Sequence, residues 1–147
     1  LCHTLMIDGT TSDCDLRGKN LRKMNLAGFW DAGSGSWIDM ETNLSEADLR
    51  RADLRKSNLE KVKFFKADLR KTLLTEANLT EAYLSSAWLQ ETDLQWANLS
   101  RAILRYSINL TPAQIQSAKI DRETKVPHYL KIHWISETDF RCEEKSR

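Results

Sequence analysis

A large apolar residue recurs at every fifth position along the middle of the chain, and we call these positions centres. Two positions before each centre stands a residue no larger than Val. Leu16, Leu21 and Leu26 continue the pattern upstream, with a less regular small position. The thirteen centres in unbroken register are Leu44, Leu49, Leu54, Leu59, Phe64, Leu69, Leu74, Leu79, Leu84, Leu89, Leu94, Leu99 and Leu104.

A period of five fits neither regular secondary structure. In an α-helix a step of five rotates the side chain by about 140°, which would scatter the centres around the whole cylinder. In a flat strand an odd step would throw successive centres onto opposite faces. The pattern instead predicts a backbone that turns a corner every five residues, so that all centres point at one axis. Four corners would close a coil of about twenty residues, and coils would stack roughly 4.8 Å apart.

The repeated motif, A-(D/N)-L-x-x, resembles that of pentapeptide-repeat proteins. It is clearest at Ala47-Asp48-Leu49, Ala67-Asp68-Leu69 and Ala97-Asn98-Leu99, and the resemblance covers roughly residues 14–26 and 42–106. It implies an all-β solenoid, a right-handed quadrilateral β-helix with short α-helical caps, as in cyanobacterial and plastid-type members. Sixteen pentapeptides would make about four coils.

Four parts of the chain follow from this pattern. Residues 1–13 are expected to be an N-terminal capping segment and residues 14–106 the β-helix. Residues 107–119 are expected to form a C-terminal capping helix, with Thr111 as N-cap and Gln114 completing a capping box. Residues 120–147 form an extension rich in apolar residues, which we expect to pack back on the solenoid.

The spacing between Leu26 and Leu44 is not a multiple of five, so a loop of about residues 27–42 is inserted there. Phe29, Trp30 and Trp37 flank its Gly-Ser core and are candidate contact residues. Two interpretations stay open: these aromatic side chains cover an open side of the solenoid, or they form an exposed recognition loop.

The position just before the centre is Asp or Asn in eight of the thirteen repeats. In four others it is Leu73, Tyr83, Trp88 or Ile103, and these outward side chains need a cover. We expect the C-terminal extension to fold back over them.

Charge narrows the range of partners. Because 22 basic residues nearly cancel 21 acidic ones, the net charge is +1, which disfavours nucleic acid as a partner. The twenty-residue period does gather one local basic cluster. Its members, which form the candidate interaction surface, are Arg50, Arg51, Arg55, Lys56, Arg70 and Lys71. The alternative is a solvated face in which these cations alternate with carboxylates.

No catalytic or metal-binding constellation is recognisable. His128 and His133 have a spacing that suits no metal pair on a helix or strand, and no phosphate-binding loop is present. We therefore predict no enzyme activity, no cofactor and no small-molecule substrate. The chain also has no apolar run long enough to span a membrane.

The three cysteines, Cys2, Cys14 and Cys142, are too few for a disulfide scaffold. They leave the compartment open. The chain could be cytoplasmic, or periplasmic or in the thylakoid lumen if Cys2 and Cys14 are bridged.

These observations favour a structural scaffold that binds an unidentified protein. One alternative is a nucleic-acid role through the basic cluster. Another comes from the family resemblance, in which one branch mimics DNA and inhibits DNA gyrase. That branch presents a strongly negative rod, whereas this chain carries a net charge of +1.

Overall fold

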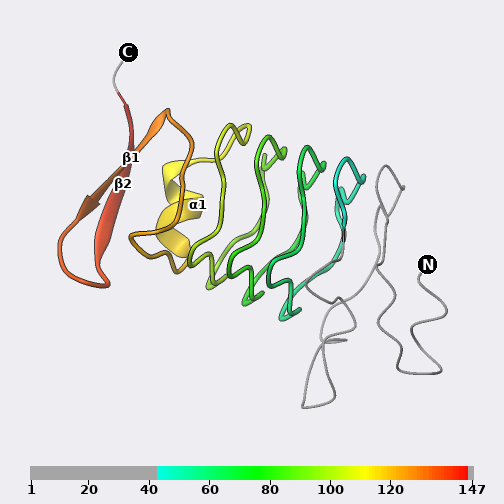
Figure 1. Ribbon diagram of the computed structural model, residues 1–147, viewed down its shortest axis with the longest axis horizontal. Helices are drawn as coiled ribbons and strands as arrows, with labels where there is room; N and C mark the ends of the chain where they lie inside the picture. The colour runs from blue at the N-terminus through cyan, green and yellow to red at the C-terminus, as the bar shows by residue number, and fades with distance from the viewer. Residues whose placement is uncertain (1–42, 146–147) are drawn as a thin grey trace.

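The structure, a computed structural model, describes residues 43–145 (Figure 1). Several predictions fall outside the described residues: the N-terminal cap, the repeats at Leu16, Leu21 and Leu26, the inserted loop at 27–42, and Cys2 and Cys14. Within the described part, three elements are assigned. They are α1 (Pro112–Ser117), β1 (Leu130–Trp134) and β2 (Phe140–Glu144).

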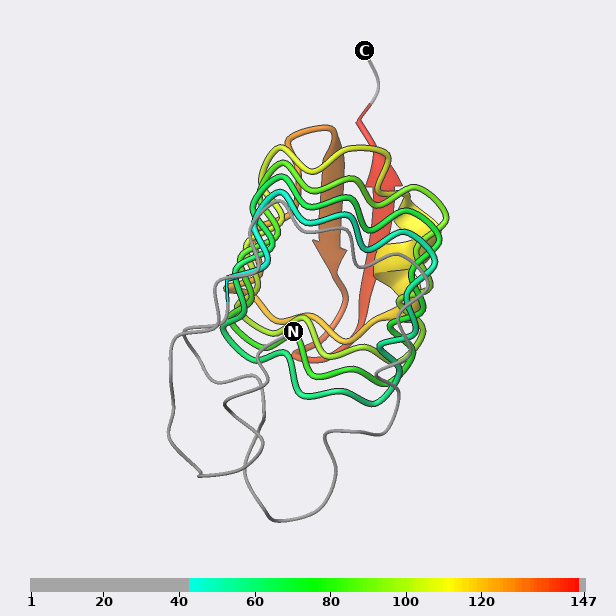
Figure 2. The same ribbon diagram turned by 90° about the vertical axis from the view of Figure 1, so that its right-hand side faces the viewer.

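Backbone pairing in the repeat region advances by twenty residues. Parallel bridges join Asn43 to Lys63, Lys63 to Tyr83 and Tyr83 to Ile103. Figure 1 shows the coils side by side, and Figure 2, which looks along the stack, shows them superimposed around one axis. The five-residue period therefore builds a solenoid, with each coil hydrogen-bonded to the next.

The bridges define four outward faces, each named by the residues that precede the centres. Face 1 carries Asn43, Lys63, Tyr83 and Ile103, face 2 carries Asp48, Asp68, Trp88 and Ile108, face 3 carries Asp53, Leu73 and Asp93, and face 4 carries Asn58, Asn78 and Asn98. After each centre, a corner of two residues leads to the next face.

The centres fill the interior. All thirteen are buried, with no more than 3% of any one exposed. The small positions from Ala47 onward are buried beside them. At two of these positions a Thr hydroxyl donates to a backbone carbonyl: Thr72 Oγ1 to the Leu49 oxygen and Thr92 Oγ1 to the Leu69 oxygen, both at 2.7 Å. Burying one such Leu contributes about 1.5–3 kcal/mol before entropy is subtracted.

Each corner is a turn whose second residue adopts a left-handed backbone conformation. From Glu46 to Tyr106 these residues have φ between 56° and 62°, although none is Gly. This conformation costs an L-residue about 1–2 kcal/mol. It is retained because the amide of that residue continues the ladder, as where the Lys61 amide donates to the Thr80 oxygen at 2.9 Å.

The C-terminal end begins with the predicted helix start. Thr111 is the N-cap of α1, Pro112 is its first residue, and Gln114 completes a reciprocal capping box. The helix ends at Ser117, two residues before the predicted Lys119, because the chain then rejoins the coil. There the Ser117 oxygen accepts from the Trp96 amide at 2.8 Å.

The chain after α1 pairs with the last coil as a further coil would, although its sequence lacks the repeat motif. Lys119 bridges to Asn98 and Lys125 to Ile103. Thr124 Oγ1 donates to the Leu99 oxygen at 2.9 Å, as Thr72 and Thr92 do in earlier coils.

Strands β1 and β2 then form an antiparallel hairpin at the C-terminal end of the stack (Figure 1). Leu130 and Phe140 are buried there, and the Gln116 side chain binds the Phe140 oxygen and the Cys142 amide at 2.7 and 3.1 Å.

The hypothesis that the extension covers the outward apolar residues is wrong for three of the four, whereas Ile103 does pair with Lys125 of the extension. Leu73, Tyr83 and Trp88 keep 37%, 45% and 42% of their surface exposed. The apolar residues of the extension are used at the end of the solenoid instead, since the open coil there also offers a hydrophobic surface. No helix of the described part is long and apolar enough to cross a membrane.

Candidate interaction surface

The Asp or Asn before each centre has a local structural role. Its Oδ1 accepts a hydrogen bond from the amide of the first corner residue, two positions later, at 3.0–3.3 Å. This side chain therefore caps a corner amide that the coil-to-coil ladder does not use. The eight capping residues are Asn43, Asp48, Asp53, Asn58, Asp68, Asn78, Asp93 and Asn98.

The other repeats lack this cap. At Leu73, Tyr83, Trp88 and Ile103 an apolar side chain stands where the acceptor would be. A hydrogen bond of this kind contributes about 0.5–1.5 kcal/mol net. These four residues therefore occupy positions where Asp or Asn would serve the fold better.

Three of the four lie on two neighbouring faces. Tyr83 and Ile103 stack on face 1, while Trp88 stacks with Ile108 on face 2. The corner between these faces adds further aromatic residues. We call this surface the apolar strip, and its members are Phe65, Tyr83, Trp88, Ile103, Tyr106 and Ile108.

The sequence reasoning missed the aromatic corner residues. Phe65 is 43% exposed, and Trp96 and Tyr106 are each 69% exposed. Their signal was present, because corner positions in the other repeats are almost all polar. Trp96 belongs to the corner after face 3, away from the apolar strip.

The predicted basic cluster stacks as the twenty-residue period requires, since Asp48 bridges to Asp68 and the Arg51 amide donates to the Arg70 oxygen at 3.1 Å. Its charges are largely paired. Arg50 and Arg70 each fork back onto the Asp two positions earlier, with contacts of 2.5–2.8 Å.

Three more cations of the cluster also lie close to carboxylates. Arg55 binds Asp53 at 2.7 and 2.9 Å, Lys56 lies 3.7 Å from Glu76, and Lys71 lies 3.4 Å from Glu91. The hydrogen bond from Arg55 lowers the pKa of Asp53 below its ordinary value, and the same contact raises the pKa of Arg55. Of the six predicted cations, only Arg51 has no carboxylate partner in the described part of the chain.

A hollow of about 330 Å³ lies over this cluster. Its lining residues are Arg50, Arg51, Arg70, Lys71, Gln90 and Glu91. The carboxylates around it hold the side chains in place, which leaves little unbalanced positive charge for a phosphate.

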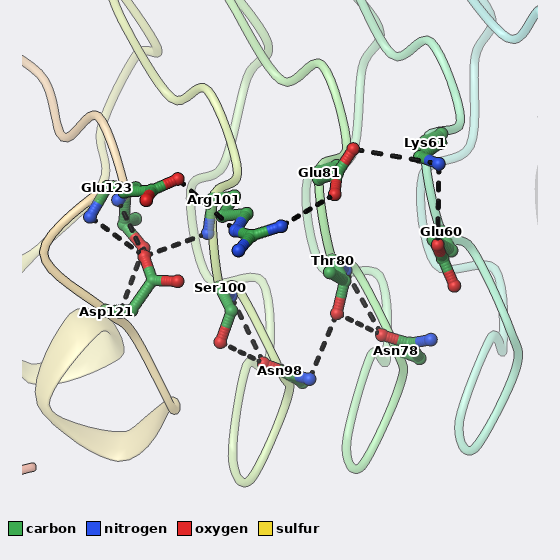
Figure 3. Close-up of polar contacts among 11 residues, drawn as sticks. Glu60, Lys61, Asn78, Thr80, Glu81, Asn98, Ser100, Arg101, Asp121 and Glu123 are labelled. Atoms are coloured by element: carbon green, nitrogen blue, oxygen red, sulfur yellow. Dashed lines mark hydrogen bonds and ion pairs between the residues drawn. The ribbon is translucent and has the colours of Figure 1, made fainter.

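Face 4 is saturated with polar contacts of its own (Figure 3). Asn78 Nδ2 donates to Asn58 Oδ1 at 3.0 Å, and Asn98 Nδ2 donates to Thr80 Oγ1 at 3.0 Å. Thr80 in turn donates its hydroxyl to Asn78 Oδ1 at 2.6 Å. Hydrogen bonds therefore tie the outward side chains of one coil to those of the next.

The corner after face 4 carries a chain of ion pairs (Figure 3). Lys61 lies 3.8 Å from Glu81, Glu81 lies 3.4 Å from Arg101, and Arg101 lies 3.2 Å from Glu123. We call this side of the rod the asparagine face: Asn58, Asn78 and Asn98 with the corner residues that follow them.

A larger cavity of about 840 Å³ opens where face 2 meets the C-terminal hairpin. Tyr106, Ile108 and Tyr129 are among its walls. The Tyr129 hydroxyl donates to the Ser107 oxygen at 3.0 Å and accepts from the Leu110 amide at 3.1 Å. This cavity therefore lies at the end of the apolar strip, and two hydrogen bonds hold the Tyr129 side chain in its wall.

Outside the repeat ladder, the titratable side chains of residues 43–145 include His133, Glu143 and Cys142. No group of three His, Cys, Asp or Glu residues there could hold a metal ion. His133 binds Glu143 at 2.7 Å, and this contact lowers the pKa of Glu143. Burial raises the pKa of the Cys142 thiol to about 11, which makes it a poor nucleophile. Phe29, Trp30 and Trp37, the predicted loop contacts, lie outside the described residues.

Comparison with protein families gives one match. Residues 42–80 and 77–107 match the family described as Pentapeptide repeats, in eight copies. No curated protein sequence matches the chain.

Solved structures of the same kind resemble the chain. A pentapeptide repeat protein (Rfr23) from the cyanobacterium Cyanothece 51142 is 26% identical, with a TM-score of 0.39, over 85% of this chain and 96% of the other. QnrB1, a plasmid-mediated fluoroquinolone resistance protein, is 19% identical, with a TM-score of 0.50, over 76% of this chain and 59% of the other.

A third similar structure is a pentapeptide repeat protein from the Arabidopsis thaliana thylakoid lumen. It is 24% identical, with a TM-score of 0.31, over 67% of this chain and 56% of the other. Together with the repeat match, the likeness to QnrB1 supports the right-handed quadrilateral β-helix typical of such repeats.

Proposed function

Since its repeat region belongs to the pentapeptide-repeat family, we propose that this chain is a non-enzymatic scaffold that binds another protein. The outside of the β-helix supplies the binding surface, and the buried centres supply a rigid support. Repeat solenoids offer extended surfaces of this kind because each coil leans only on its neighbours.

One observation carries the proposal. Four repeats give up the Asp or Asn cap and present Leu73, Tyr83, Trp88 and Ile103 instead, three of them well exposed. A large apolar side chain that serves neither the core nor the corner amide is explained by contact with another molecule.

The proposal includes the shape of the rod. About four coils are formed if the repeats before Leu44 stack in the same way. Helix α1 and the hairpin of β1 and β2 act as the C-terminal cap, which prevents coils of two molecules from pairing end to end.

A nucleic-acid role through the basic cluster is less well supported. Arg50, Arg55 and Arg70 each engage a carboxylate of their own repeat. A phosphate would have to compete with these contacts. A DNA mimic is also less well supported, because the Asp residues are neutralised by these Arg residues and the net charge is +1, whereas a DNA mimic needs a negative surface.

The test is chemical cross-linking and affinity capture from extracts of the native organism. The bait is the intact chain, compared with a triple variant Leu73→Asn, Tyr83→Asn, Trp88→Asn. Asn at these positions restores the corner cap, so the variant should fold. The matched control is Asp53→Asn with Asp93→Asn, which changes capping residues without touching an apolar side chain.

We expect a specific protein to be captured by the wild type and the control, and to be lost with the triple variant. If no protein is captured, or if the captured proteins are the same for all three baits, the proposal fails.

A further inference from the structure

We propose that the apolar strip recognises an acidic amphipathic segment of the partner, in which apolar side chains are flanked by Asp or Glu. This inference rests on the proposed function and specifies the partner's chemistry.

The strip combines bulky and small residues. Along the corner between faces 1 and 2, the hydrogen-bonded ladder places Phe65 and Lys66 on one side of Ser85 and Ser86. Arg105 and Tyr106 stand on the other side of the two serines, with Tyr83 and Trp88 on the adjoining faces. An apolar side chain of the partner can approach the backbone at the serines and contact aromatic rings around it.

Three cations and two carboxylates without a described ion pair border the strip; the carboxylates are Glu46, whose amide donates to the Phe65 oxygen, and Glu144, in the cavity at the end of the strip. Lys66 lies over the Phe65 ring at 5.1 Å and makes no ion pair with a described residue. Arg105 and Lys125 likewise have no carboxylate partner within residues 43–145. Lys125 is paired through its backbone with Ile103, so it borders the strip.

The asparagine face shows the contrast. There both cations, Lys61 and Arg101, engage carboxylates at 3.2–3.8 Å. Cations that border exposed apolar residues and have no carboxylate partner among residues 43–145 are complementary to carboxylates of another molecule.

A second copy of this chain fits the strip less well. In a two-fold dimer the same patch faces itself, which would bring Lys66 and Arg105 of both copies together. Like charges in an interface are costly.

Single-stranded nucleic acid also fits less well, because base stacking needs open aromatic faces. Lys66 covers one face of Phe65 at 5.1 Å, and Arg70 covers one face of Trp88 at 5.5 Å. The aliphatic Ile103 and Ile108 provide no stacking surface at all.

The experiment selects a library of random dodecapeptides displayed on phage against the immobilised intact chain, and then measures selected peptides by fluorescence anisotropy. We expect enrichment of sequences that combine large apolar residues with Asp or Glu. In a double variant, Tyr83→Asn with Trp88→Asn, their affinity should fall at least about tenfold, as for hot-spot residues.

Two further variants separate the contributions. Trp96→Asn makes the same kind of change at an exposed side chain in the corner after face 3, outside the strip, and should leave affinity unchanged. Lys66→Gln with Arg105→Gln keeps the apolar residues and should weaken binding while flattening its salt dependence. Circular dichroism confirms that each variant is folded.

Enrichment of basic or uncharged peptides, no enrichment, or equal loss with Trp96→Asn would overturn this inference. Tighter binding of an oligothymidylate than of any acidic peptide would overturn it as well. If a protein is captured from extracts and lost with the triple variant, while selected peptides bind the double variant as tightly as the wild type, the scaffold function stands and the strip does not recognise an acidic segment.

Discussion

The asparagine face and the apolar strip are two sides of one rod, built from the same repeat, yet they bond in opposite ways. On the asparagine face, Asn78 caps its own corner amide and donates to Asn58 of the neighbouring coil. On the strip, Tyr83 and Trp88 make no such cap and are 45% and 42% exposed. The difference shows which outward positions serve the fold and which are exposed without a corner cap.

The interior beneath the two sides should be equivalent, and the largest predicted effect tests this. Leu79, the centre of face 4, and Leu84, the centre of face 1, are 0% and 1% exposed. We expect Leu79→Ala and Leu84→Ala each to lower the free energy of unfolding by about 2–5 kcal/mol, through lost burial and a new cavity. Urea denaturation measures both; a much smaller loss for Leu84→Ala would show that the strip side of the core is loosely packed.

The second prediction removes polar bonding from the asparagine face. Asn78→Leu deletes the acceptor for the amide and hydroxyl of Thr80 and the donor to Asn58. With each lost hydrogen bond costing about 0.5–1.5 kcal/mol, we expect a total loss of about 2 kcal/mol in urea denaturation. Leu73 occupies the same position on face 3, so the solenoid should remain folded. No change in stability would mean that the asparagine ladder does not hold the coils together.

The sequence predicts the features of this contrast that follow from the repeat period, but not those that depend on the conformation of a single side chain. The inward direction of Leu49 or Phe64 follows from a period that no helix or flat strand can satisfy. The stacking of Arg50 below Arg70 follows from four such periods. The ion pairs do not follow, because Arg50 could extend into solvent, and only its side-chain geometry shows that it turns back onto Asp48.

The C-terminal end was harder to predict. The capping box at Thr111 and Gln114 is a local signal, and the structure confirms it. Leu130, Ile132 and Trp134 alternate with polar residues as a strand should, but their partner strand is fixed by contacts with α1 rather than by local pattern. The apolar character of Tyr83 and Trp88 was visible in the sequence, whereas their exposure was not, because it depends on where the extension lies.

The third prediction introduces the missing cap on the strip. Tyr83→Asn should supply an acceptor for the Ser85 amide, as Asn78 does for Thr80. The free energy of unfolding should rise by about 0.5–1.5 kcal/mol, measured by urea denaturation. The same substitution is expected to weaken partner binding, so stability and binding change in opposite directions. A loss of stability would instead show that Tyr83 is needed for the fold.

The fourth prediction concerns the ion pairs beside the asparagine face. Glu81→Gln separates Lys61 from Arg101 in the chain shown in Figure 3. Because these groups are partly exposed, we expect a loss of at most about 1 kcal/mol, which shrinks as salt is added. Thermal unfolding at low and high ionic strength measures it. A salt-independent loss would indicate that packing of the Glu81 side chain, not its charge, is responsible.

The smallest predicted effect separates carboxylate caps from asparagine caps. The hydrogen bond from Arg55 lowers the pKa of Asp53 in the folded state, so the charged form is favoured by folding. Its contribution to the free energy of unfolding is present above the unfolded pKa of about 3.9 and is lost as the pH falls through the lower folded value.

The variant Asp53→Asn keeps an acceptor for the Arg55 amide but removes this titration. The variant should therefore lose less stability than the wild type between neutral and strongly acidic pH in urea denaturation, while Asn98→Ala, which removes a cap that does not titrate, should leave the acid dependence unchanged. Equal acid dependence of Asp53→Asn and the wild type would show that the charge of Asp53, and with it the fork to Arg55, adds nothing to folding.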